Sequence, residues 1–470
     1  MAGIGFELNK LLKKNSFFSD LFSFFYSANV SAGPWIMSSI TLVVIQLLIP
    51  QERIPFFISG IIYTFIFSTI IFGSFSTSVT RYLADLIYKK EFEKIYRLYT
   101  SSISYALLSS AIFLFVFFLI NKLFDVVKIF LFSYSLTVLT IIWVQIVFIT
   151  AIRIFTPVVV SFLVGSFISL FGSIYLFKLK GEYFAYLGYN LGLMFIMSLL
   201  QLFIKRYLFV QSISEKSGFL FWEAIKTYKK QAISGFLTYM AAWVDDFIAW
   251  YHFRYSLSKG FIFAPQYDIP MFVSYLFIIP TLTLFVLSLE TSFYFNYRSF
   301  YESIEENRTL NFIKINKRML DDNLFSTTKL ILSVQFSFAL SGIILSSSLG
   351  KLLLLDSYGL KALRFGIVGA AANGIFLYVS LIAHYFDLPE IPMHASIIAF
   401  CVNSIISFIT IIRFPAIGFA IGFIIAILYS WIMFRKIYKD LLHFEFIRNR
   451  LSLPPRRVII HKTEENQPLR

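Results

Sequence analysis

The sequence predicts an all-α membrane protein with about twelve transmembrane helices in two six-helix lobes. Composition is the first reason: 58% of the 470 residues are hydrophobic and only 14% are charged, whereas soluble domains carry about 25% charged residues. Secondly, apolar stretches of about 20 residues, the length that crosses a bilayer as a helix, recur along the chain. Thirdly, a polar interval at residues 205–230 divides these stretches into two equal sets. Two lobes with a pathway between them are a common transporter plan.

Each predicted lobe contains six apolar stretches. The N-lobe, residues 21–204, contains Leu21–Ile49, Ile54–Val79, Ser101–Ile120, Val126–Ile152, Pro157–Phe177 and Tyr183–Ile204. The C-lobe, residues 231–435, contains Ala232–Tyr255, Tyr267–Phe295, Phe325–Gly350, Leu363–Phe386, Pro392–Ile412 and Pro415–Phe434. In its charged loop, residues 296–328, apolar residues recur at near-helical spacing. We expect this loop to form a cytoplasmic amphipathic helix or to dock a cytoplasmic partner.

Basic residues indicate the orientation. Most of the 41 Lys and Arg residues fall in the N-terminal arm, in every second loop, in the linker 205–230 and in the tail 436–470. Because Lys and Arg collect on the cytoplasmic side, we expect both termini and the linker to be cytoplasmic. Residues 1–20 combine lysines with apolar residues at helical spacing, which predicts an amphipathic helix lying on the membrane surface.

Two C-lobe stretches carry acidic residues. Asp245 and Asp246 lie inside the first, Asp268 begins the second, and Glu290 is near its far end. A carboxylate at the centre of a spanning helix costs about 2.5–3.5 kcal/mol, so these groups should face a wet cavity or a partner. Each has two interpretations: a structural acid, or part of a pathway for a proton, a cation or a cationic substrate. Asp245 and Asp246 are about 100° apart on a helix, so one narrow cavity does not serve both equally.

Aromatic residues surround these acids in the sequence. Trp243, Trp250, Tyr251 and Tyr267 are the nearest. Rings of this kind mostly fill cores or form interfacial belts, and the alternative is a wall on which sugar rings stack.

Helix-breaking residues mark candidate hinges. Gly33 and Pro34 interrupt the first stretch and Pro280 interrupts the eighth; each is either a static kink or a hinge. Arg81 and Asp85 are four residues apart, a spacing that favours a structural ion pair at the cytoplasmic rim.

Several functions are disfavoured. The chain has no Gly-rich nucleotide-binding loop with its Lys and Ser/Thr, and its five His residues form no HExxH motif, so we expect neither ATPase nor other enzyme activity and no cofactor. A single cysteine, Cys401, argues against a disulfide or a zinc site. The net charge of +15 is explained by cytoplasmic loops, not nucleic-acid binding. The near absence of basic residues deep in the stretches disfavours carriers of pyrophosphate-linked lipids.

Several motifs resemble the Pel exopolysaccharide transporter (PelG) family. They are Met1–Leu8 followed by Lys10–Lys14, then Ser31–Trp35, Trp243–Tyr251, Tyr267–Pro280 and Glu290–Thr291. The resemblance extends from the first residue to about Tyr301. Asp245 and Glu290 match the family pattern, whereas Asp246 stands where a basic residue is common.

This resemblance implies a twelve-helix member of the multidrug/oligosaccharidyl-lipid/polysaccharide flippase superfamily in the bacterial inner membrane. It would move nascent Pel, an amino-sugar polymer, to the periplasm. The implied partners are a cytoplasmic glycosyltransferase and membrane subunits of a cyclic-di-GMP-regulated synthase. Coupling to an H⁺ or Na⁺ gradient stays open beside transport driven by polymerisation. The alternatives are a scaffold that anchors the glycosyltransferase without transport, and an exporter of lipid-linked oligosaccharides or small molecules.

Overall fold

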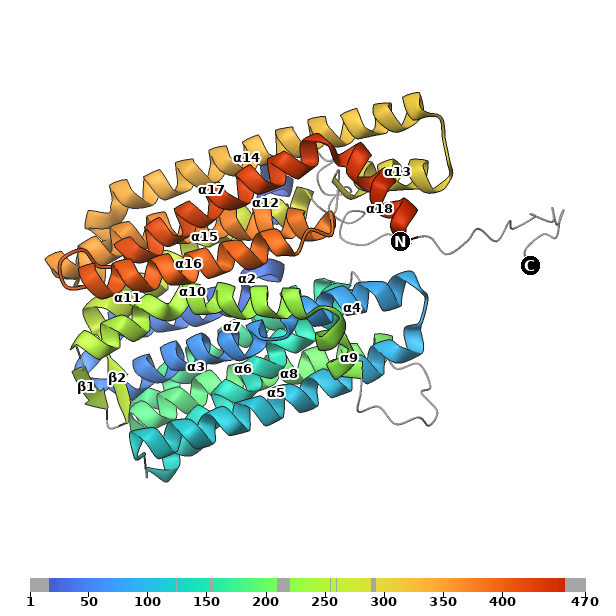
Figure 1. Ribbon diagram of the computed structural model, residues 1–470. Helices are drawn as coiled ribbons and strands as arrows, with labels where there is room; N and C mark the ends of the chain where they lie inside the picture. Colours follow the sequence, from blue (N-terminus) through green and yellow to red (C-terminus); the bar gives the residue numbers. More distant parts are fainter. Residues whose placement is uncertain are drawn as a thin grey trace.

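The computed structural model describes residues 17–123, 125–151, 155–208, 220–253, 255–258, 260–288 and 293–452. Glu290 and most of the predicted amphipathic helix over residues 1–20 lie outside these ranges, as do residues 453–470 of the tail. Within them the protein is a bundle of long helices that run roughly side by side (Figure 1).

The first half of the chain follows the predicted stretches with one interruption. Its elements are α2 (Phe17–Leu48), η1 (Gln51–Arg53), α3 (Pro55–Gly73), α4 (Ser76–Tyr88), α5 (Phe92–Asn121), α6 (Val126–Ala151), α7 (Thr156–Lys180), α8 (Glu182–Leu208) and α9 (Leu220–Thr227). The predicted stretch Ile54–Val79 is therefore two helices. The backbone leaves helical geometry at Phe75 (φ −138°), and the Ser74 hydroxyl donates to the Ile71 carbonyl, a local bond that competes with regular helix.

The second half contains the acidic segments. Its elements are α10 (Lys229–Phe253), β1 (Tyr255–Ser258), β2 (Phe261–Phe263), α11 (Pro265–Ser274), η2 (Tyr275–Ile278), α12 (Ile279–Ser288), α13 (Tyr294–Glu305), α14 (Leu310–Leu352), α15 (Ser357–Tyr385), α16 (Glu390–Thr410), α17 (Ile417–Lys439) and α18 (Leu441–Ser452). The predicted single stretch Tyr267–Phe295 is a discontinuous helix, broken by η2. The predicted loop 296–328 is helical: it comprises most of α13 and the first part of the 43-residue helix α14.

Among the described residues, eleven helices are long and apolar enough to cross a membrane. Helix α10 is not one of them by composition, because it carries Asp245, Asp246 and two lysines within 25 residues. It nevertheless lies inside the bundle, packed mainly against α16 and α3 (Figure 1). The expected set of about twelve long helices in a multi-pass membrane protein is thus confirmed.

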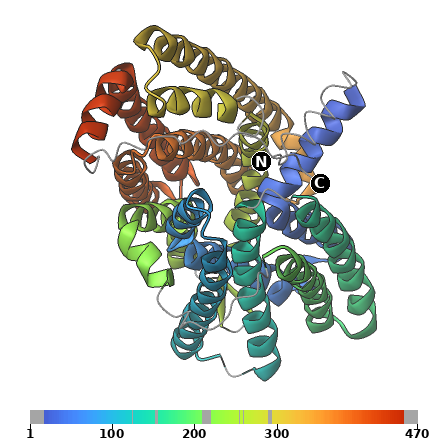
Figure 2. The same ribbon diagram turned by 90° about the vertical axis from the view of Figure 1, so that its right-hand side faces the viewer.

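The two halves lie beside each other, and α10 and α11 of the second half pack against the first half (Figure 1). In the end-on view, α14 and α15 lie above the first-half helices α5–α8 (Figure 2). Helices α4, α9, α13 and α18 lie at one end of the bundle, and the β1–β2 hairpin lies at the other (Figure 1). The connections rich in Lys and Arg therefore share one end, as the predicted topology requires; that this end is cytoplasmic stays a prediction.

Small residues let the halves approach closely where α3 crosses α10. A Cβ atom on Gly235 would lie 2.5 Å from the Gly73 carbonyl oxygen, and one on Gly73 would lie 2.2 Å from the Tyr239 ring. Gly73 is the last residue of α3, so the predicted second stretch breaks where the two backbones cross. Crossings of this type are typical of membrane bundles, in which small residues allow tight packing.

Candidate functional site

Asp245, on α10, is fully buried where α10 meets α11 and α16. Its Oδ2 accepts a hydrogen bond from the Tyr267 hydroxyl of α11. Its Oδ1 accepts one from the Asn403 Nδ2 of α16, 3.0 Å away. The Ser407 hydroxyl donates to Asn403 Oδ1 over 2.8 Å, which fixes the amide so that its NH₂ group faces Asp245. Asp245 is therefore held by neutral donors from two other helices.

Asp268 has the contacts of a structural acid. The Trp250 Nε1 donates to both of its carboxylate oxygens at 3.0 Å. The Ala264 N–H, which precedes α11, donates to Oδ2 at 2.8 Å. Asp268 thus satisfies a backbone N–H at the N-terminus of α11 and ties that helix to α10.

Asp246 differs from both neighbours. It is 1% exposed, yet its Oδ2 has no hydrogen-bond partner among the residues that the structure describes. In the part of the chain that the structure describes, no Lys, Arg or His forms an ion pair with Asp245, Asp246 or Asp268. An ionised carboxylate buried without compensation is strongly disfavoured. The cluster formed by these three aspartates (the acidic cluster) is therefore suited to take up a proton, which removes a buried negative charge.

The predicted aromatic residues join the two halves. Trp243 of α10 stacks on Trp35 of α2, with centroids 5.6 Å apart, and its Nε1 donates to Thr69 of α3 at 3.0 Å. Trp250 stacks on Tyr63 of α3 at 4.3 Å and 11°. Tyr251, in contrast, is 60% exposed. In this conformation both indole rings pack against the first half. The Trp243 Nε1 is hydrogen-bonded to α3 and the Trp250 Nε1 to Asp268 of α11, so the two rings form no open sugar-stacking wall.

Both predicted proline positions coincide with breaks. Ala32, just before Gly33 and Pro34, has non-helical angles (φ −137°, ψ 18°) inside α2. Pro280 is the second residue of α12, the helix that directly follows η2. The kinks are thus observed, and hinge motion at them stays a proposal.

A buried glutamine fills the break at Pro280. In a regular helix the Thr281 N–H would donate to the Phe277 carbonyl. Instead, the Thr281 N–H donates to Gln335 Oε1 at 3.1 Å, and Gln335 Nε2 donates to the Phe277 carbonyl at 2.7 Å. The side-chain amide of Gln335, on α14, is therefore inserted into the opened backbone bond. Because a bilayer offers no water to satisfy these groups, this insertion keeps the broken helix viable.

The two residues of the predicted rim pair have different partners. Arg81 lies 4.0 Å from Asp387, in the connection between α15 and α16. Asp85 accepts a hydrogen bond from Tyr228, which precedes α10. The i,i+4 spacing suggested a bond within α4, but tertiary packing directs Arg81 across to the second half.

The comparisons with known proteins agree with this architecture. The family model described as "PelG: Putative exopolysaccharide Exporter (EPS-E)" matches residues 1–446. The chain belongs to the PelG family. The match includes the last four long helices, which carry no recognisable motif. The protein is therefore a multi-pass membrane transporter or flippase of an exopolysaccharide exporter family.

Solved structures similar to this PelG-family chain share its fold. A eukaryotic MATE transporter, AtDTX14, matches with a TM-score of 0.58 and 13% identity, over 91% of this chain and 96% of that one. Outward-facing and inward-facing structures of a multidrug resistance MATE transporter of the MOP superfamily both match with a TM-score of 0.56. Their identities are 14% and 12%; each match covers 88% of this chain, and it covers 96% and 95% of the other. A comparison with functionally curated proteins gives no match.

Three residues of this candidate site were not predicted from the sequence: Asn403, Gln335 and Trp35. Asn403 and Gln335 are buried polar residues in apolar helices, which is a weak but readable signal of a hydrogen-bond role. Trp35 belongs to the Ser31–Trp35 motif, but the sequence does not assign it to the site. Its position against Trp243 depends on how α2 meets α10, and the sequence alone does not specify that contact.

Proposed function

We propose that the protein moves a nascent Pel-type amino-sugar exopolysaccharide from the cytoplasm to the periplasm across the bacterial inner membrane, together with a synthase. The observation that carries this proposal is the PelG family match over residues 1–446. We further propose that the chain catalyses no reaction, and that the synthase alone builds the polymer.

The proposed path runs between α2 and α3 on one side and α10 and α11 on the other. Separation of these helices would uncover Trp35, Trp243 and Trp250, whose rings now pack across that contact. Aromatic faces bind the apolar faces of rings. The same movement would bring Asp245 to the polymer, where a carboxylate can accept charge-assisted hydrogen bonds from free amines.

The acidic cluster also suggests how transport is coupled. We propose that Asp246, with its unpartnered Oδ2, binds a proton or Na⁺ when the cluster is buried. The MATE relatives in outward-facing and inward-facing conformations support an alternating opening of the two halves. Transport driven only by polymerisation would leave this position without a role.

We propose that the glycosyltransferase docks at the end where α13 and α14 meet. Leu310, Phe312 and Ile315, near the start of α14, are exposed apolar residues, and exposed apolar patches often mark protein contacts. Cyclic-di-GMP-regulated membrane subunits are the further partners that the family suggests.

Secretion by a strain carrying Asp245→Asn tests the proposal. We expect secreted polymer to fall about tenfold. A hydrogen bond to a charged group contributes about 1.5 kcal/mol or more, and about 1.4 kcal/mol corresponds to a tenfold change. Protein level in the membrane and co-purification of the glycosyltransferase should stay normal.

Asp356→Asn is the matched control. Asp356 caps α15 through the Gly359 N–H at 2.7 Å, and asparagine caps helices about as well, so secretion should not change. Normal secretion with Asp245→Asn would contradict a transport role for Asp245 and would favour the scaffold alternative.

A further inference from the structure

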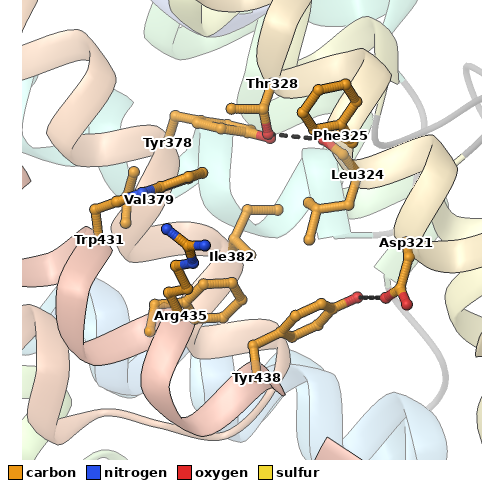
Figure 3. A pocket seen from close by; sticks show the side chains of 11 residues that line it. Asp321, Leu324, Phe325, Thr328, Tyr378, Val379, Ile382, Trp431, Arg435 and Tyr438 are labelled. Carbon is orange, nitrogen blue, oxygen red and sulfur yellow. Dashed lines mark hydrogen bonds between the residues drawn. The ribbon is translucent and has the colours of Figure 1, made fainter.

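A cavity of about 410 Å³ lies between α14, α15 and α17, away from the acidic cluster. Its volume falls in the range of small-molecule sites, about 300–1,000 Å³. Asp321 and Leu324 come from the first part of α14, and Arg435 and Tyr438 come from the last turns of α17 (Figure 3). The cavity is therefore at the end of the bundle where α13 and α18 lie (Figure 1).

The walls of this cavity are mainly apolar, and two of the rings that line it are exposed on the surface of the bundle. Leu324, Val379 and Ile382 line it, and Phe325 and Trp431 at its edge are 74% and 43% exposed. In a membrane bundle such exposed rings face lipid, and tryptophan is enriched at the membrane–water interface. The cavity is thus accessible from the bilayer close to one interface.

Most polar groups of the cavity already have partners. The Thr328 and Tyr378 hydroxyls are 2.7 Å apart (Figure 3). Asp321 accepts hydrogen bonds from Lys317 Nζ at 2.8 Å and from the Tyr438 hydroxyl at 2.7 Å. The charge of Asp321 is therefore balanced by Lys317 within its own helix.

Arg435 is the exception. It lines the cavity, with its guanidinium group beside Trp431 and Ile382 (Figure 3), and it is an exposed residue at the cavity mouth. Among the described residues it has no hydrogen-bond or ion-pair partner. A guanidinium presents a planar fork of donors that matches phosphate oxygens. An apolar cavity with one unpaired arginine at its mouth suits a ligand that has an acyl chain and an anionic head.

We propose that this cavity binds an anionic glycerophospholipid from the leaflet on the α13–α18 side. One acyl chain fills the space between α14, α15 and α17, and the phosphate accepts hydrogen bonds from Arg435. The bound lipid bridges three helices of the second half. This site is independent of the proposed polymer path.

Quenching of Trp431 fluorescence tests the site. Full-length protein is placed in nanodiscs that contain phosphatidylglycerol or phosphatidylcholine with brominated acyl chains. The chain contains other tryptophans, so the contribution of Trp431 is taken as the difference in quenching between the unmodified protein and the Trp431→Phe variant. We expect phosphatidylglycerol to occupy the site about fivefold more readily, as attraction of about 1 kcal/mol per basic residue gives.

Two variants assign the preference to one side chain. Arg435→Gln should remove the preference for phosphatidylglycerol. Lys436→Gln, an equal loss of charge on the neighbouring residue of α17, does not line the cavity and should keep it. Arg435→Lys keeps the positive charge and should retain a weaker preference for phosphatidylglycerol. This variant provides the test if Arg435→Gln folds poorly.

Equal quenching of Trp431 by the two lipids in the unmodified protein would overturn the proposal, because the cavity would then hold only nonselective surrounding lipid. An equal loss of preference in Arg435→Gln and Lys436→Gln would also overturn it, since the selectivity would then belong to the general surface charge.

Discussion

Hydrogen-bond partners distinguish three carboxylates whose burial is almost the same. Asp268 accepts a backbone N–H and an indole N–H, so it fits a structural role at the start of α11. Asp245 is held by a hydroxyl and an amide, both of which can also serve a bound substrate. Asp246 retains an oxygen to which no described residue donates. We therefore assign a structural role to Asp268. As proposals, we assign substrate binding to Asp245 and ion coupling to Asp246.

At the crossing of α3 and α10, Gly235→Ala should destabilise the protein. The new Cβ would lie 2.5 Å from the Gly73 carbonyl oxygen and 2.8 Å from Thr77 Oγ1, and a backbone atom cannot rotate away. Overpacking of this kind costs about 1–3 kcal/mol, measurable as a lower melting temperature of the purified protein in detergent.

Gly172→Ala, on α7, is the matched control. The nearest atom to its Cβ would be 3.5 Å away, an ordinary contact, so the melting temperature should be unchanged or slightly higher, as helix propensity favours alanine. Equal effects of the two substitutions would show that the α3–α10 crossing is looser than described.

The acids could be found from the sequence, but their partners could not. Charged residues inside apolar stretches are conspicuous because their burial is costly. Asn403 and Asp245 are 158 residues apart in the chain, and no local pattern connects them. The same holds for Arg81 and Asp387: the spacing within α4 predicted Asp85 as the partner, and long-range packing decided otherwise.

At the scale of elements, the broken helix α11–η2–α12 is the main departure from the predicted stretches. Hydropathy is averaged over about 20 residues, so it does not detect a 3-10 segment of only four residues such as η2. Pro280 gave a local signal of the break. The group that repairs it, Gln335, lies on another helix and could be identified only from the structure.

Gln335→Leu should weaken the broken helix, because it leaves the Phe277 carbonyl and the Thr281 N–H unpaired in an apolar environment. An unsatisfied buried polar group costs about 1–3 kcal/mol. The melting temperature should fall, and amide hydrogen exchange should rise in residues 275–281 and not elsewhere.

Gln46→Leu, in α2, provides the comparison. Both polar atoms of the Gln46 side chain are buried and have no hydrogen-bond partner in the described part of the chain, so its replacement by an apolar residue should be neutral or stabilising. Unchanged stability in Gln335→Leu would show that the inserted amide contributes nothing to the break.

At the scale of the whole molecule, contacts join the halves at both ends and in the middle. At the α4 end, Arg81 lies beside Asp387 of the second half. At the hairpin end, the Tyr63 hydroxyl donates to the Ile262 carbonyl at 2.6 Å. Between them, Trp35 and Trp243 stack. The buried acidic cluster is therefore sealed in this conformation, and export along the proposed path requires the halves to separate.

Reversible cross-linking at the α4 end tests this requirement most directly. In a Cys401→Ser background, Arg81→Cys and Asp387→Cys are joined by a short bis-methanethiosulfonate reagent. It forms a disulfide with each cysteine, releases sulfinate, and is cleaved by a reductant. Both native side chains are about one-third exposed, at 38% and 33%. The control joins Lys230→Cys to Glu390→Cys, which replaces an ion pair between α10 and α16 within the second half. We predict that the Arg81–Asp387 cross-link stops polymer secretion until it is cleaved, while the control cross-link leaves secretion intact. Undiminished secretion with the halves cross-linked would contradict a polymer path between them.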